Sequence, residues 1–236
     1  MPMLLGRNEG GVRRWIDDIL GIATLVGMVV ALWLILIYTP VELVQGASQK
    51  VFYIHLASIW NAYLSFFFVF VASILYLRRA SPATDRFARA WAEVGVIFIS
   101  ITLISGAIWG KPIWGTYWSW DPRLTTTLLL WIIYVVYLML RGFVGDPERG
   151  RRYAAIVGIV GFIDVPIVHM SVRWWRTLHP DPIVARAEGP DLPMSMWYTV
   201  LYCIVVFTVL AIFLVRQRLQ IDELRETLTH LRMSAR

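Results

Sequence analysis

Six stretches of this sequence are long and apolar enough to cross a lipid bilayer. They lie at about residues 19–38, 57–77, 94–109, 124–140, 154–170 and 196–215. A membrane-spanning helix needs roughly 20 mostly apolar residues, and Asp164 and Pro166 make the fifth stretch the weakest of the six. No repeat or long linker divides the chain. We therefore expect an all-α integral membrane protein with six transmembrane helices, formed by residues 1–236 as one domain.

The composition agrees with a chain that has lipid as its main solvent. Hydrophobic residues make up 58% of the chain and charged residues 16%, against roughly 25% charged residues in a soluble domain. The first stretch is too long for a signal-peptide core and lacks a small-residue cleavage site after it, so it predicts a retained span. The single cysteine, Cys203, excludes an internal disulfide, and the lack of a CxxCH motif excludes a c-type cytochrome.

The distribution of basic residues predicts the orientation in the membrane. Of the 22 Lys and Arg residues, 16 lie before the first span, between the second and third, between the fourth and fifth, and after the sixth; the three alternate segments hold 6. Cytoplasmic segments of membrane proteins carry the excess of Lys and Arg, so we expect both termini in the cytoplasm. Because topology explains the basic residues, we expect no nucleic-acid partner. The basic tail, residues 216–236, includes a predicted short charged helix at Asp222–Arg232.

The outer segment between spans 3 and 4 is rich in tryptophan. Four tryptophans and a tyrosine fall within the first twelve residues of Trp109–Arg123, and glycine and proline interrupt them, which predicts a loop and not a regular helix. An interfacial aromatic belt accounts for one or two of these rings. The others offer a stacking surface for a large, flat, apolar ligand, and a porphyrin fits that description.

Histidines flank this tryptophan-rich segment on the same predicted face. His55 opens span 2, His169 ends span 5 and His179 follows in the last outer segment, whereas His230 lies in the tail. A single histidine near a membrane interface is usually an amphipathic boundary residue. Two imidazoles from separate segments would also suit axial ligation of a haem iron, and both interpretations stay open on the residues alone.

Charged residues on the outer face offer partners for the haem propionates. Arginine is suited to bidentate pairing with a carboxylate, although each of these side chains has Asp121 or a lipid headgroup as an alternative partner. The candidates are Lys50, Lys111, Arg123, Arg173 and Arg176. Asp164 falls inside span 5, where a carboxylate is either functional or hydrogen-bonded beside the bend expected at Pro166.

Several motifs resemble one known family. Residues 114–125, WGTYWSWDPRLT, are similar to the tryptophan-rich WWD signature of the haem-handling proteins of cytochrome c biogenesis. Residues 53–55, 109–112 and 171–179 agree, and the resemblance covers about Trp15–Val215. The six-span architecture is most similar to the haem exporter protein C (CcmC) family. The chain departs from the family pattern at Tyr117, at Asp164 and at residues 126–127, which leaves any fixed role for Asp164 in doubt.

The resemblance implies a site and a set of partners. His55 and His179 would be the axial ligands of the haem iron, with His169 outside the ligand set. The tryptophan-rich segment would contribute Trp114, Trp118 and Trp120 facing the porphyrin or a partner, and Asp121 and Arg123 fixing the loop or orienting a propionate. The cargo would be haem b, delivered at the periplasmic face of a bacterial inner membrane to a membrane-anchored haem chaperone. The other implied partners are the ATPase and permease subunits of an ABC transporter, a small single-span membrane subunit and membrane lipid.

Three other functions compete with delivery. A haem lyase that acts directly on apocytochrome c is expected to have more spans and more histidines. A b-type electron-transfer protein would carry its histidine pairs on helices within the bundle, whereas His179 precedes Pro180 in a loop. A transporter of another solute would need a polar path, and the spans carry almost no charge apart from Asp164. Whether the protein is an enzyme stays open.

Overall fold

A computed structural model of the chain describes residues 5–180, 189 and 192–234 and is built from helices. These are α1 (Leu5–Trp33), α2 (Val51–Arg79), α3 (Pro82–Trp114), α4 (Pro122–Phe143), α5 (Pro147–Phe162), α6 (Asp164–Trp174) and α7 (Met194–Ser234). A π-helical segment, Leu34–Tyr38, continues α1. Taking α5 and α6 together, six helical segments are long and apolar enough to cross a membrane. The prediction of a six-span, all-α membrane protein is therefore confirmed.

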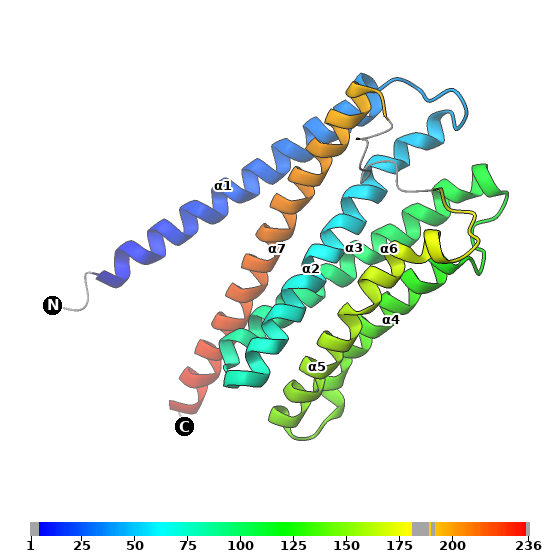
Figure 1. Cartoon of the computed structure of the whole chain (residues 1–236). Helices are drawn as coiled ribbons and strands as arrows, with labels where there is room; N and C mark the ends of the chain where they lie inside the picture. The colour runs from blue at the N-terminus through cyan, green and yellow to red at the C-terminus, as the bar shows by residue number, and fades with distance from the viewer. Residues whose placement is uncertain (1–4, 181–188, 190–191, 235–236) are drawn as a thin grey trace.

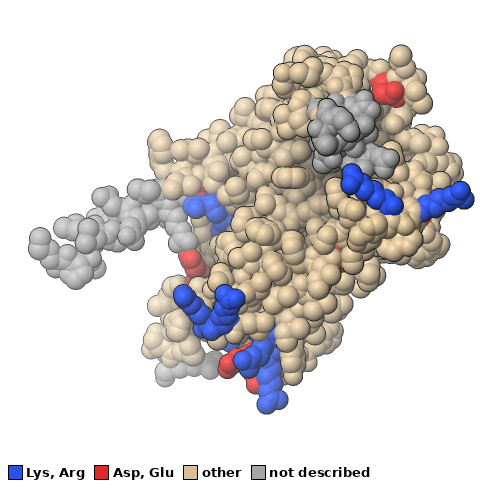
Figure 2. Space-filling view, viewed as in Figure 1, with Lys and Arg blue, Asp and Glu red and all other residues tan. Residues whose placement is uncertain are grey.

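The helices form an elongated bundle, and α1 begins at the same end of it at which α7 ends (Figure 1). Helices α2 and α3 pack as an antiparallel hairpin, α4 packs against α5 and α6, and α1 contacts mainly α7. Figure 2 shows Lys and Arg near the ends of the visible face, with a broad uncharged band between them. This pattern places the lipid-facing zone along the middle of the bundle.

The expectation that Trp109–Arg123 is irregular throughout is wrong for its first part. Helix α3 continues through Pro112 to Trp114 and ends at Gly115, which adopts a left-handed conformation (φ 76°) and donates its N–H to the Lys111 carbonyl. Gly110 is accommodated because the Trp114 ring fills its open side, where a Cβ would lie 2.8 Å from that ring. The irregular loop is therefore limited to residues 115–121.

Two other segments differ from a simple six-helix pattern. The fifth span is divided at Ile163, and Asp164 begins α6 with one buried carboxylate oxygen that has no hydrogen-bond partner among the described residues. The residues of the predicted short charged helix, Asp222–Arg232, are helical, but they form the end of α7, which runs unbroken from the membrane to Ser234. Ion pairs from Arg218 to Glu93 and from Glu226 to Arg86 hold this extension against α3.

Candidate functional site

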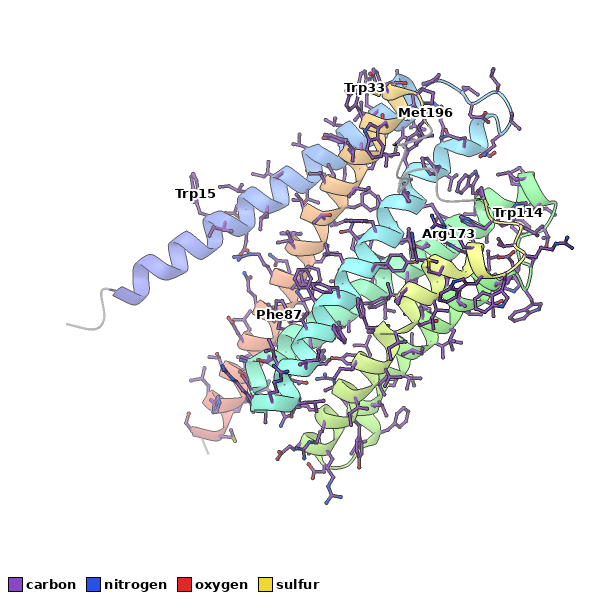
Figure 3. The ribbon with its side chains drawn as sticks, in the orientation of Figure 1. Trp15, Trp33, Phe87, Trp114, Arg173 and Met196 are labelled. Carbon is purple, nitrogen blue, oxygen red and sulfur yellow. The ribbon has the colours of Figure 1, made fainter. Side chains whose placement is uncertain are left out.

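A cavity of about 250 Å³ opens at the end of the bundle opposite the termini. Its walls come from α2, α3, the start of α4 and the segment that follows α6. The wall includes His55, Ile59, Tyr63, Trp109, Trp114, Trp118, Arg123, Leu178 and His179. Figure 3 shows Trp114 and Arg173 at this same end. The sequence-predicted histidine pair thus shares one cavity with two of the three predicted tryptophans.

His55 lies in the second turn of α2 and faces α3. Its Nδ1 is 3.1 Å from the Ser105 hydroxyl, which donates its single proton to the Thr102 carbonyl at 3.2 Å. The Ser105 oxygen therefore accepts from a protonated Nδ1, and the lone pair of the neutral ring lies on Nε2. Gly106 permits this approach, since a Cβ there would be 3.1 Å from the imidazole. Metal-binding histidines commonly have this arrangement, with the second ring nitrogen donating to the protein.

His179 has the same arrangement in a different structural setting. It lies outside the helices, and its Nδ1 is 2.9 Å from the Pro180 carbonyl oxygen. A carbonyl only accepts, so Nδ1 carries the proton and Nε2 carries the lone pair. Burial lowers the pKa of His179 to about 4, with the positive charge of Arg123 as a further cause. The imidazole is therefore neutral at neutral pH, the form that binds iron.

Asp121 connects the tryptophan loop to the segment that carries His179. Its buried carboxylate caps α4 by accepting from the Arg123 N–H at 2.9 Å. The same carboxylate accepts from the Thr177 hydroxyl at 2.8 Å and from the Leu178 N–H at 2.7 Å. The His179 N–H in turn donates to the Thr177 hydroxyl at 3.0 Å. Asp121 therefore fixes the backbone just before His179, which favours its loop-fixing role over pairing with a propionate.

The three predicted tryptophans have different positions. Trp114 and Trp118 line the cavity, and the Trp114 ring centroid is 6.4 Å from that of His179. Trp120 is absent from the cavity wall, is 76% exposed and packs edge-on against Trp118 at 5.6 Å. Trp109, which was not among the predicted site residues, also lines the cavity and packs edge-on against His55 at 5.7 Å.

Arg123 is the basic residue in the described cavity wall. Its guanidinium donates to the carbonyls of Val168 and His169 at 3.3 and 3.4 Å, so it lies close to α6. Lys50 instead donates to backbone carbonyls at the end of the first span, and Lys111 donates to Gly115 at 2.8 Å. Arg173 and Arg176 are exposed outside the cavity wall.

Sequence reasoning missed several polar residues of this site, among them Tyr63 in the cavity wall and Ser105 beside His55. Tyr63 lines the cavity, and its buried hydroxyl has no hydrogen-bond partner among the described residues. His55, Ile59 and Tyr63 all line the cavity and follow each other at intervals of four along α2. This helical spacing is the signal that could have identified Tyr63. No sequence signal distinguishes Ser105 from the other hydroxyl residues of α3.

The fold and the cavity define a multi-pass membrane protein with a mostly apolar, two-histidine pocket at one end of its bundle. The chain belongs to the heme exporter protein C family, whose sequence model matches residues 10–234.

Relatives with the name heme exporter protein C agree with this membership. The protein of Bradyrhizobium diazoefficiens is 36% identical over 194 residues, which cover 82% of this chain and 74% of the relative. That of Haemophilus influenzae is 34% identical over 81% of this chain and 78% of the relative. That of Paracoccus denitrificans is 30% identical over 95% of this chain and 92% of the relative.

Proposed function

We propose that this protein binds haem as cargo between His55 and His179 and delivers it for cytochrome c maturation. The family membership supports haem handling in general. The observation that carries the specific proposal is that the two imidazoles line one cavity with the same hydrogen-bonding pattern. In each ring Nδ1 is hydrogen-bonded to the protein, which leaves the Nε2 lone pair to bind iron. Trp114 and Trp118 offer apolar ring surface in the same wall, and Arg123, the arginine of that wall, is the proposed partner of a propionate.

The size of the cavity favours delivery over storage. Pockets that enclose small ligands usually measure about 300–1,000 Å³, and this cavity, at about 250 Å³, is smaller. In this proposal a porphyrin enters the cavity in part and keeps one edge exposed to a partner. The second ligand, His179, lies in a non-helical segment, and such segments are displaced at lower free-energy cost than helices packed in a bundle.

The recipient in this proposal is a membrane-anchored haem chaperone at the periplasmic face of a bacterial inner membrane. The ABC transporter subunits, the small single-span subunit and the identity of the cargo as haem b belong to the same proposal. The chain's own part is to bind and release haem, with the covalent attachment completed on the chaperone. A b-type electron carrier is disfavoured because one ligand lies outside the helices.

The proposed delivery predicts transfer in a mixing experiment. Purified haem-loaded protein is mixed with tagged apo chaperone, and the chaperone is then denatured and tested for haem that remains bound. We expect haem to move onto the chaperone, because the exposed edge and the loop ligand allow exchange. If no haem moves while the bound haem is rapidly reduced by quinol and reoxidised, the electron-transfer alternative replaces delivery.

The proposed orientation places the cavity outside and both termini in the cytoplasm. It rests on the excess of basic residues at the terminal end, although Arg186, one of the counted outer residues, lies outside the described residues. Reporter domains fused after Arg79 and Arg152 should behave as cytoplasmic, and a reporter near Glu188 as periplasmic. The reverse pattern of reporter activity would overturn this orientation and the site of delivery.

Replacing Trp118 with alanine should lower haem content, whereas replacing Trp120 with alanine should mainly slow haem transfer. Trp118→Ala removes a ring from the cavity wall, so we expect several-fold less haem in the purified protein. Stacking of a flat ring on an aromatic side chain contributes about 1–3 kcal/mol when the ring is a nucleobase. Trp120→Ala should keep near-normal haem content and mainly slow transfer, because this ring is 76% exposed at the rim. Equal haem content in the two variants, measured by pyridine haemochrome, would contradict this division.

A further inference from the structure

The end of α7 carries an apolar stripe that lies uncovered among the described residues. Its members are Ile221, Leu224, Leu228 and Leu231, with exposed fractions from 44% to 64%. Their intervals of three, four and three residues are those of the a and d positions of a heptad repeat. Such a stripe, which we call the α7 seam, is the feature by which one helix packs lengthwise against another.

The opposite side of the same helix is already occupied. Arg218 and Glu226 form ion pairs with Glu93 and Arg86 of α3, and Asp222 pairs with Arg218 within α7. At roughly 100° per residue, the α7 seam points about 140° away from that contact. Figure 1 shows α1 diverging from α7 toward this end of the bundle. The helix is therefore held in place by α3 while the seam faces outward.

Lipid is a poor candidate to cover the seam. With a helical rise of about 1.5 Å per residue, Leu224 and Leu231 lie about 13 and 24 Å along the helix from Val215, where the apolar span ends. The headgroup layer adds only about 5–8 Å to each side of the hydrocarbon core. Because α7 continues without a break, its seam extends beyond the bilayer surface.

The charges beside the seam indicate which kind of helix would cover it. Arg225 and Arg232 occupy the flanking e positions, and Gln220, Thr227 and Ser234 occupy the g positions, so α7 itself carries no carboxylate on either flank. Gln220, at the start of the seam, donates to Asp17 of α1, and the positions beyond it keep the two arginines as the flanking charges. A second copy packed antiparallel would place arginine opposite arginine, and a parallel copy would place arginine opposite uncharged side chains. Residues at e and g set partner choice in paired helices.

We propose that the α7 seam is a docking site for a partner helix with an apolar face flanked by glutamate or aspartate. The seam is only about two heptads long, and short helical pairs are weak alone. The partner is therefore one held at the same membrane, where tethering raises its effective concentration.

The test uses the full chain in nanodiscs and two synthetic helical peptides as probes. Both peptides carry leucine at a and d; one has glutamate and the other lysine at e and g. We expect the glutamate peptide to bind about tenfold more tightly, with a preference that falls as salt rises. The double variant Arg225→Glu/Arg232→Glu should reverse the preference, and Leu224→Asn/Leu228→Asn should abolish binding. Thr229→Asn, an exposed change outside the seam, is the matched control.

Other occupants give distinct results. Leu228→Cys provides an exposed thiol, since the native Cys203 is fully buried. Cross-linking of this variant into dimers would show that a second copy covers the seam, and contact of a spin label at this position with lipid would show that the bilayer does. Either result overturns the proposal, as does equal binding of both peptides or binding of neither.

Discussion

Replacing His55 or His179 with alanine should reduce the haem retained through purification by about tenfold or more, equivalent to at least about 1.4 kcal/mol. Each substitution removes one of two imidazoles that line the cavity with Nε2 available. Cytochrome c assembly should fall with it. The haem content is measured by pyridine haemochrome, and the axial ligation by the absorption spectrum of the protein in detergent.

Added imidazole provides the critical control for ligation. It should restore part of the haem signal in both variants, because a small imidazole can occupy the position that the side chain leaves. His169→Ala should have much less effect, since the His169 side chain is not in the cavity wall. His230→Ala, on the exposed end of α7, should have none. Equal sensitivity of His169 and His179 would contradict the ligand assignment.

Replacing Asp121 with alanine should resemble the loss of His179. The carboxylate holds the Thr177 hydroxyl and the Leu178 N–H, so its removal releases the backbone just before the ligand. We expect about 10- to 100-fold weaker haem retention, the range found when residues that orient metal ligands are changed. Imidazole should restore the haem signal here as it does in His179→Ala, whereas simple unfolding would give no rescue.

Asp146 offers a matched control for the capping role of Asp121. It caps α5 by accepting from the Glu148 and Arg149 N–H groups and is exposed at the other end of the bundle. Loss of either cap should cost about 0.5–2 kcal/mol of stability, but Asp146→Ala should leave haem retention unchanged. Equal loss of haem in the two variants would mean that Asp121 acts through helix stability alone.

The limits of the sequence analysis are clearest along the tryptophan-rich segment. Glycine and proline predicted an irregular chain from Trp109 onward, but α3 continues to Trp114. Side-chain packing outweighs the propensities of glycine and proline here: the Trp114 ring, one turn further along α3, fills the space beside Gly110, and Trp109 packs against His55 of α2. The helix predicted in the tail is present, but ion pairs to α3 support it as part of one continuous α7 and not as a short helix of its own.

The sequence by itself determined the six spans and the choice of His55 and His179 as candidates. The length of each apolar stretch and the motifs follow directly from the order of the residues, so they can be recognised without knowing how the helices pack. Only the tertiary structure decided that the two imidazoles share a cavity, that Ser105 and Pro180 engage Nδ1 of each, and that Asp121 anchors the segment before His179. The two histidines are 124 positions apart, and the contacts to Ser105 and Asp121 join residues 50 and 57 positions apart, so they depend on how the helices pack and not on any local pattern.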